Sequence, residues 1–154
     1  MSRTAVSRVI GVPASRAYAW VADPRTHPRW IPVTRLDALD GADFTMVSGP
    51  FARRGAPGFV DRMTTTGGEA PGSSSRADGA GWSAVVKRGP VLLGTAGFEV
   101  VPLAVDRCRV VWWEDAYLAG PVPRRVTDPA VSLVLRALVR TSLRRLDRAL
   151  TAHR

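Results

Sequence analysis

The sequence predicts an α+β fold in which a curved antiparallel sheet of about seven strands wraps around one long C-terminal helix. Three observations predict it: an uninterrupted helical pattern from Asp128 to His153, strand and turn patterns from Val33 to Leu118, and an opening strand followed by two short helices. The chain has 154 residues, of which 45% are hydrophobic, so it has the size of one globular domain with a single core. We therefore expect a single domain over residues 1–154.

The C-terminal helix has the clearest pattern. Asp128 followed by Pro129 predicts its start, because an Asp oxygen accepts from free amide groups and Pro has no amide proton to lose. The expected apolar stripe consists of Val131, Val134, Leu135, Leu138, Ser142, Leu146, Ala149 and Leu150, widened by Leu133, Val139 and Leu143, and the opposite face carries Arg136, Arg140, Arg144 and Arg148. A helix of roughly 25 residues is about 38 Å long, so its stripe requires a sheet as partner.

The N-terminal part predicts one strand and two short helices. Thr4 to Val12 are rich in β-branched residues, which suits a strand. Apolar residues from Ala14 to Ala22 share one helical face, and Asp23-Pro24 ends that helix because the residue before proline disfavours the helical conformation. The following PRTHPRWIP contains three prolines, so it fits one further helical turn that buries Trp30.

Six strands joined by hairpin turns are expected next. The strands are Val33 to Leu39, Asp43 to Phe51, Gly58 to Thr66, Gly81 to Arg88, Val91 to Val101 and Arg107 to Leu118, with turns at Asp40-Gly41, Gly67-Gly68, Gly89-Pro90 and Val105-Asp106. Consecutive hairpins predict an antiparallel sheet. Gly67 to Gly81 has the most disorder-like composition and fits a flexible hairpin loop, because a strand resumes directly after it.

Five segments carry a resemblance to a known superfamily. They are VADPRTHPRWIP (21–32), GFVDRM (58–63), VVKRGPVLLG (85–94), GFEVVP (97–102) and RVVWWED (109–115). Together with the order of the elements, they resemble the SRPBCC or START-like superfamily of the polyketide cyclase/dehydrase type, and look like uncharacterised actinobacterial members. The resemblance implies the helix-grip fold, with a mostly apolar cavity between sheet and last helix in which members bind lipids, polyketides, quinones or hormones.

Strand alternation predicts which side chains face such a cavity. The expected inward sets are Phe59, Asp61, Met63 and Thr65; Trp82, Ala84, Val86 and Arg88; Leu92, Gly94, Ala96, Phe98 and Val100; and Val110, Trp112, Glu114, Ala116 and Leu118. On the last strand the odd positions are nearly as apolar as the even ones. Three charged residues, Asp61, Arg88 and Glu114, then face an otherwise apolar space.

This trio has two interpretations, because a buried charge is costly unless it is paired. In the favoured one, Arg88 forms a structural ion pair with Asp61 or Glu114, or the alternation is displaced by one residue and all three meet solvent. In the other, Arg88 anchors a ligand carbonyl, phenolate or carboxylate, and a carboxylate of raised pKa assists proton transfer. The candidate ligand-binding residues are Arg88, Asp61, Glu114, Trp112, Trp82, Trp30, Phe59 and Phe98, although the tryptophans suit a core equally well.

The remaining motifs argue against several other classes of site. Cys108 is the only cysteine, and no Cys and His cluster is present, so we expect no disulfide, no metal and no cofactor. The glycines do not form a phosphate-binding loop, and no nucleophile motif is present. His27 lies between prolines and suits packing or the surface better than base catalysis, and His153 lies at the end of the helix.

The net charge of +9 comes from 21 arginines and Lys87, but the arginines are spread along the chain, so we expect them to promote solubility rather than to bind nucleic acid. No apolar run is long enough for a transmembrane segment, and the N-terminus lacks a signal peptide's apolar region, so we expect a cytoplasmic protein, either a monomer or a weak homodimer.

Three functions stay open: binding of a hydrophobic small molecule, which we favour; a polyketide aromatase/cyclase or dehydratase with acid/base assistance; and an interaction module that uses the arginine face. No catalytic residue is assigned.

Overall fold

A computed structural model describes residues 3–152 and confirms the predicted fold class. Seven strands form one antiparallel sheet in the order β1-β7-β6-β5-β4-β3-β2. The strands are β1 (Thr4–Ile10), β2 (Thr34–Asp40), β3 (Asp43–Ser48), β4 (Phe59–Glu69), β5 (Gly81–Pro90), β6 (Leu92–Ala104) and β7 (Arg107–Leu118). The helices are α1 (Ala14–Val21), α2 (His27–Trp30) and α3 (Arg124–Thr151), with short 3-10 turns η1 (Pro24–Thr26) and η2 (Ala52–Arg54).

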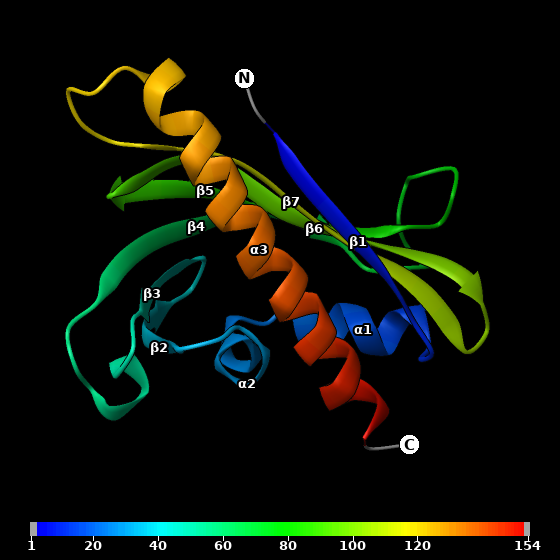
Figure 1. Ribbon diagram of the computed structural model, residues 1–154. Helices are drawn as coiled ribbons and strands as arrows, with labels where there is room; N and C mark the ends of the chain where they lie inside the picture. Colours follow the sequence, from blue (N-terminus) through cyan, green and yellow to red (C-terminus); the bar gives the residue numbers. More distant parts are fainter. Residues whose placement is uncertain (1–2, 153–154) are drawn as a thin grey trace.

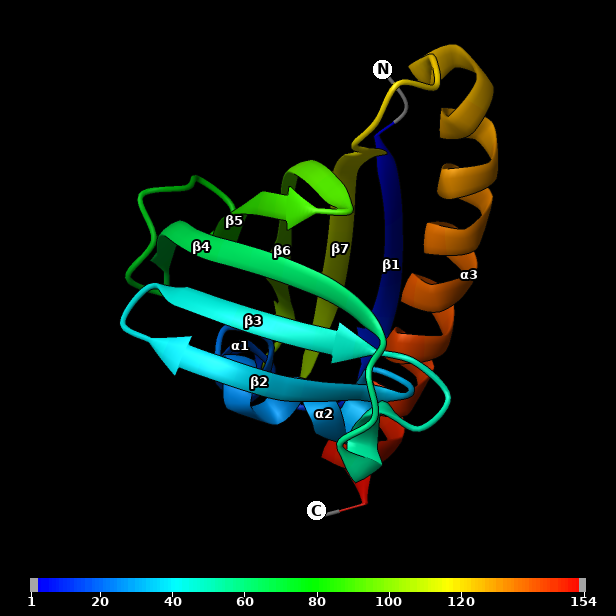
Figure 2. The same cartoon turned by 90° about the vertical axis from the view of Figure 1, so that its left-hand side faces the viewer.

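The sheet curves around α3, which crosses its concave side diagonally (Figure 1). Figure 2 shows α1 and α2 at one end of the sheet, beside the C-terminal half of α3. The helix α3 contacts β1, β7 and α2. The side of the sheet formed by β2 to β4 curves away from the N-terminal half of α3 (Figure 2).

The start of α3 differs from the prediction. The helix begins at Arg124 after Pro123, and Pro129 lies within it. A proline inside a helix removes one backbone hydrogen bond, here the one to the carbonyl of Arg125, and that residue is exposed, so water can satisfy the carbonyl. Asp128 therefore does not cap the helix; its carboxylate lies 3.8 Å from the Arg124 guanidinium, one turn earlier. The predicted end at His153 lies outside the described residues.

The two halves of α3 have different surroundings. In the C-terminal half, the apolar stripe is buried as predicted. Its buried residues are Val139, Ser142, Leu143, Leu146 and Leu150. The four apolar ones among them pack with Ile10, Val12, Ala14, Ala17, Val21, Trp30, Ile31, Phe98, Val100, Cys108, Val110 and Trp112 to form the core. In the N-terminal half, Leu133 and Val134 are exposed. The arginines of the opposite face, Arg136, Arg140, Arg144 and Arg148, are all exposed.

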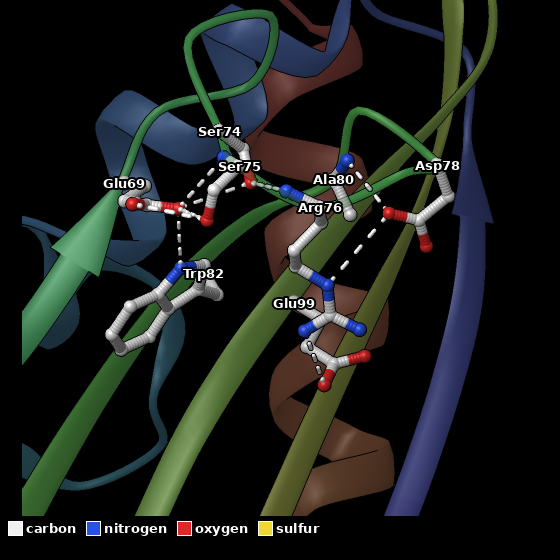
Figure 3. A network of polar contacts seen from close by, with 8 residues as sticks. All are labelled: Glu69, Ser74, Ser75, Arg76, Asp78, Ala80, Trp82 and Glu99. Carbon is white, nitrogen blue, oxygen red and sulfur yellow. Dashed lines mark hydrogen bonds and ion pairs between the residues drawn. The ribbon is translucent and has the colours of Figure 1, made fainter.

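The connection between β4 and β5 is more ordered than its composition predicts. β4 continues through Gly67 and Gly68 to Glu69, so the predicted turn at these glycines is wrong. The Glu69 carboxylate accepts hydrogen bonds from the Trp82 indole at 3.0 Å and from the Ser75 amide at 3.1 Å (Figure 3). Arg76 then pairs with Glu99 on β6 at 3.1 Å. These contacts explain how a chain rich in glycine and serine holds one path across the end of the sheet.

Candidate functional site

A cavity of about 430 Å³ lies between the sheet and the N-terminal half of α3, within the usual size range of ligand pockets. Its apolar lining residues are Val21, Ala22, Pro24, Ile31, Phe44, Met46, Phe59, Met63, Val85, Leu92, Ala96, Phe98, Trp112, Leu118, Ala130, Val131, Val134, Leu135 and Leu138. The polar ones are His27, Thr34, Ser48, Asp61, Thr65, Ser83, Lys87 and Glu114. The apolar stripe of α3 therefore has two roles: its second half fills the core and its first half covers the cavity.

Two apolar residues of the cavity lining keep exposed surface. Val134 on α3 is 67% exposed, and Phe59 at the start of β4 is 37% exposed. An apolar molecule bound in the cavity would cover apolar side-chain surface that is otherwise exposed.

Five of the eight candidate residues predicted from the sequence line this cavity: Phe59, Asp61, Phe98, Trp112 and Glu114. The predicted inward faces of β4, β6 and β7 agree with the cavity lining and the burial of these strands.

Trp30 is not among the lining residues. It is fully buried in the core, where it packs edge to face against Trp112, with ring centroids 5.6 Å apart. It therefore supports the wall of the cavity from behind.

On β5 the predicted face is wrong by one residue. Ser83, Val85 and Lys87 line the cavity, whereas Trp82 and Arg88 lie on the outer face. The Arg88 guanidinium is exposed and donates to the Thr64 hydroxyl at 3.2 Å. Trp82 instead packs against Gly67, where a side-chain carbon would approach its ring to 2.9 Å. The large apolar residue of this strand thus covers a glycine on the outside, so apolarity alone indicates the wrong face.

The charged trio at the end of the cavity is Asp61, Lys87 and Glu114. The Lys87 ammonium lies 2.5 Å from Asp61 Oδ2 and 3.6 Å from Glu114 Oε2. Only 4% of the Lys87 side chain, 5% of Glu114 and 14% of Asp61 are exposed. The Trp112 indole N–H also donates to Glu114 Oε1 at 3.2 Å. The ion pair that was expected for Arg88 is thus made by its neighbour.

The strand β6, which lies between β5 and β7, explains how Lys87 and Glu114 come close to each other. Lys87 pairs across the sheet with Gly94 of β6, and Glu114 pairs with Ala96. Cross-strand partners share a face, so β6 presents almost no side chain between the two charged residues. The lysine and the glutamate can therefore meet above β6.

Burial and mutual charge set the protonation of the trio. Burial raises the pKa of Glu114, and the nearby Asp61 carboxylate raises it further, while Lys87 opposes the rise. For Lys87, burial lowers the pKa, but Glu114 and Asp61 outweigh burial, and its pKa is raised. Lys87 is therefore a buried ammonium, and Glu114 is a carboxyl group predisposed to hold a proton.

His27 belongs to the aromatic part of the cavity wall. Burial lowers the pKa of this imidazole to about 4, so the ring is neutral at physiological pH. Its Nε2 lies 3.0 Å from the Val21 carbonyl oxygen, which can only accept, so Nε2 carries the proton and Nδ1 is an acceptor. The ring packs edge to face against Trp30, with centroids 5.3 Å apart. This agrees with the packing role that the sequence favoured.

Residues 3–152 contain no cluster of three or more His, Cys, Asp or Glu side chains that could hold a metal ion. Within the same part of the chain, no helix combines the length and the apolar character that crossing a membrane requires.

A family model described as polyketide cyclase/dehydrase and lipid transport matches residues 1–151. The chain belongs to this family. The START-like resemblance noted in the sequence is thereby confirmed over nearly the whole chain. A comparison with curated proteins found no match.

Solved structures similar to this family member share its fold. A START superfamily protein from Mycobacterium smegmatis has a TM-score of 0.69 at 14% identity, covering 99% of both chains. The protein XoxI from Bacillus cereus also has a TM-score of 0.69 at 14% identity, covering 98% of this chain and 96% of its own. The di-domain ARO/CYC protein BexL from the BE-7585A biosynthetic pathway has a TM-score of 0.58 at 15% identity, covering 92% of this chain and 45% of BexL. At such identities these likenesses show the fold alone.

Proposed function

We propose that this protein binds a hydrophobic small molecule in the cavity between the sheet and α3. The observation that carries the proposal is a space of about 430 Å³ whose walls are mostly apolar and include one buried charged trio. A cavity of this kind buries the apolar body of a ligand and orients it through a few polar groups. The lipid-transport description of the family supports the same function.

A variant that fills the cavity tests this proposal. Leu135 lines the cavity from α3, so Leu135→Trp should occupy part of the space, whereas Leu133→Trp adds the same ring to an exposed position of the same helix. Titration with the neutral fluorescent probe N-phenyl-1-naphthylamine should show saturable binding. We expect Leu135→Trp to weaken it about tenfold, or ~1.4 kcal/mol, and Leu133→Trp to leave it unchanged. Equal effects of the two variants would place the probe outside the cavity.

A second candidate function, a polyketide aromatase/cyclase or dehydratase, is favoured by one observation. Glu114 combines a raised pKa with a position in the cavity wall beside the Lys87 ammonium. A carboxylic acid there could donate its proton to a ligand carbonyl oxygen while an enol carbon of the same ligand bonds to the carbonyl carbon. The enol then passes its O–H proton to the carboxylate, and water leaves in a later step. The likeness in fold to BexL is compatible with this function.

Turnover separates the two candidates. A linear triketone that closes to an aromatic ring gains ultraviolet absorbance, so its cyclisation can be followed directly. If Glu114 acts as the acid, the protein accelerates the reaction and Glu114→Gln removes the acceleration. The matched control is Asp115→Asn, which removes a carboxylate from the next residue of β7, outside the cavity lining. A rate equal to that of buffer alone would leave binding as the function.

A further inference from the structure

The polar end of the cavity lacks hydrogen-bond donors rather than acceptors. Lys87 directs its ammonium group at Asp61 Oδ2, at 2.5 Å, and at the Met63 sulfur, at 3.8 Å. Among the described residues, Asp61 Oδ1 and Glu114 Oε2 are buried and accept no hydrogen bond. The 3.6 Å between Glu114 Oε2 and the ammonium is an ion-pair distance that exceeds a hydrogen bond. Asp61 Oδ1 is therefore an unsatisfied acceptor in the cavity wall, and Glu114 Oε2 is one whenever that carboxyl group is ionised.

A buried acceptor without a donor is costly, and native proteins rarely leave one. Both atoms belong to residues that line the cavity, so a bound molecule lies against these two side chains. The group that satisfies them must carry an N–H or O–H. An ether, a ketone or an ester offers only further acceptors, so it cannot satisfy Asp61 Oδ1.

Charge narrows the choice of donor. With Glu114 ionised, one ammonium faces two carboxylates, so a ligand carboxylate, phosphate or phenolate would meet more negative than positive charge. With Glu114 protonated, the ammonium is already paired with Asp61 and leaves no unpaired cation for an anionic ligand. A ligand ammonium would bring a second cation into the same buried space, at a large desolvation cost. A neutral hydroxyl avoids both costs. It also suits either protonation state of Glu114, because it can donate to Asp61 Oδ1 and accept from Glu114 when that group holds a proton.

We infer that the polar end of the cavity selects an uncharged alcohol or phenol on an otherwise apolar molecule, with the hydroxyl donating to Asp61 Oδ1, and that it discriminates against carboxylates. This specificity rests on the proposed binding function. It differs from the less favoured interpretation of Arg88, in which that residue anchors a ligand carbonyl, phenolate or carboxylate. Because Lys87 already donates to Asp61 Oδ2, the ligand hydroxyl supplies the donor for Asp61 Oδ1, and the protein supplies the acceptor.

A matched ligand series tests the inference. Naphthalene, 2-naphthol, 2-methoxynaphthalene, 2-naphthoate and 2-(aminomethyl)naphthalene share one ring system, and each can compete with N-phenyl-1-naphthylamine. A hydrogen bond to a charged group corresponds to roughly a 10- to 100-fold gain in affinity. We expect 2-naphthol to bind tighter than 2-methoxynaphthalene by about that factor, and 2-naphthoate to bind more weakly than naphthalene.

The outcomes distinguish this inference from the proposed function. If naphthalene binds but the naphthol and its methyl ether bind equally, or if the naphthoate or the ammonium compound binds best, the inference is overturned and the binding function stands. If no member of the series displaces the probe, binding in the cavity fails and the inference fails with it.

Asp61→Asn sharpens the test. Lys87 donates to Oδ2, so the asparagine carbonyl oxygen should turn towards Lys87 and place the amide N–H₂ where Oδ1 now lies. The position becomes a donor, and the preference for 2-naphthol over its methyl ether should fall to about one. Asp115→Asn, with the same chemical change outside the cavity lining, should keep the preference. An unchanged preference in Asp61→Asn overturns the assignment to Asp61, and if this variant does not fold, the ligand series on the unaltered protein decides.

Discussion

Replacing Lys87 with methionine should destabilise the protein strongly at neutral pH. The substitution keeps an unbranched side chain of similar length but removes the ammonium that faces Asp61 and Glu114. No arginine or other lysine lines the cavity in residues 3–152, so the two buried carboxyl groups would have no nearby cation. Removing one partner of a buried ion pair typically costs about 3 to 5 kcal/mol.

The protonation of Glu114 gives an independent magnitude. Without Lys87, the least costly folded state holds this side chain, which is 5% exposed, as a neutral acid. Keeping a carboxyl protonated at pH 7 costs about 4 kcal/mol when its unfolded pKa is about 4.3. Because the Glu114 pKa is already raised in the unaltered protein, part of this cost is present there, and the additional loss should be less than about 4 kcal/mol. The cost falls as pH approaches the unfolded pKa, to about 1 kcal/mol at pH 5.

Urea unfolding followed by tryptophan fluorescence at pH 7 and pH 5 measures both values. Arg88→Met is the matched control, because it removes a cation from the next residue on the outer face and should change stability by less than about 0.5 kcal/mol. Equal losses for Lys87→Met and Arg88→Met would refute the buried trio. A loss at pH 5 as large as at pH 7 would attribute the effect to packing instead of charge.

Three further predictions concern the core. Leu146→Asp, which places a carboxylate in a fully buried position, should cost at least ~4 kcal/mol, whereas Leu138→Asp, which faces the cavity, should cost less than half of that in parallel thermal melts. When the pH falls from 6.5 to 4, the free energy of unfolding should drop by about 3 kcal/mol more for the unaltered protein than for His27→Gln, as measured by urea unfolding at each pH. The reason is that the imidazole of the unfolded chain gains a proton over this range, whereas the folded one, with a pKa of about 4, stays mostly neutral. Cys108, whose pKa burial raises to about 11, should resist thiol reagents at pH 8 until denaturant unfolds the chain, and rapid labelling of the native protein would contradict its placement in the core.

Much of the fold was predictable because its elements are separated by strong local signals. Hairpin turns and alternating strands identified the antiparallel sheet, and a stripe at helical spacing identified the final helix. Periodicity did not indicate where that stripe stops being core. Leu135 and Leu146 occupy equivalent positions in the pattern, yet one faces a cavity and the other is fully buried. A helix that covers a cavity needs the same apolar face as one that packs on a sheet.

Local rules were less informative where a tertiary contact decides. Asp128-Pro129 has the composition of a helix start, but the four preceding residues continue the helix, and the missing proline bond falls on an exposed turn. Gly67 and Gly68 have the composition of a turn, but β5 pairs with both of them and Trp82 covers one. In each case the residue type is permissive, and neighbouring elements select the conformation.

The finding that Lys87, and not Arg88, faces the cavity differs from these two cases, because the sequence contained the information to predict it. A two-residue turn at Gly89-Pro90 pairs Arg88 with Val91, and therefore Lys87 with Leu92. Antiparallel partners share a face, so an inward Leu92 requires an inward Lys87. This holds regardless of which face of β5 carries more apolar residues. The actual register pairs Arg88 with Leu93 and Lys87 with Gly94, which preserves that parity and opens the space above β6. Turn length thus constrains the polar site of this cavity more strongly than the hydrophobicity of β5 does, because the more apolar face of that strand, with Trp82, Ala84 and Val86, lies outside the cavity lining.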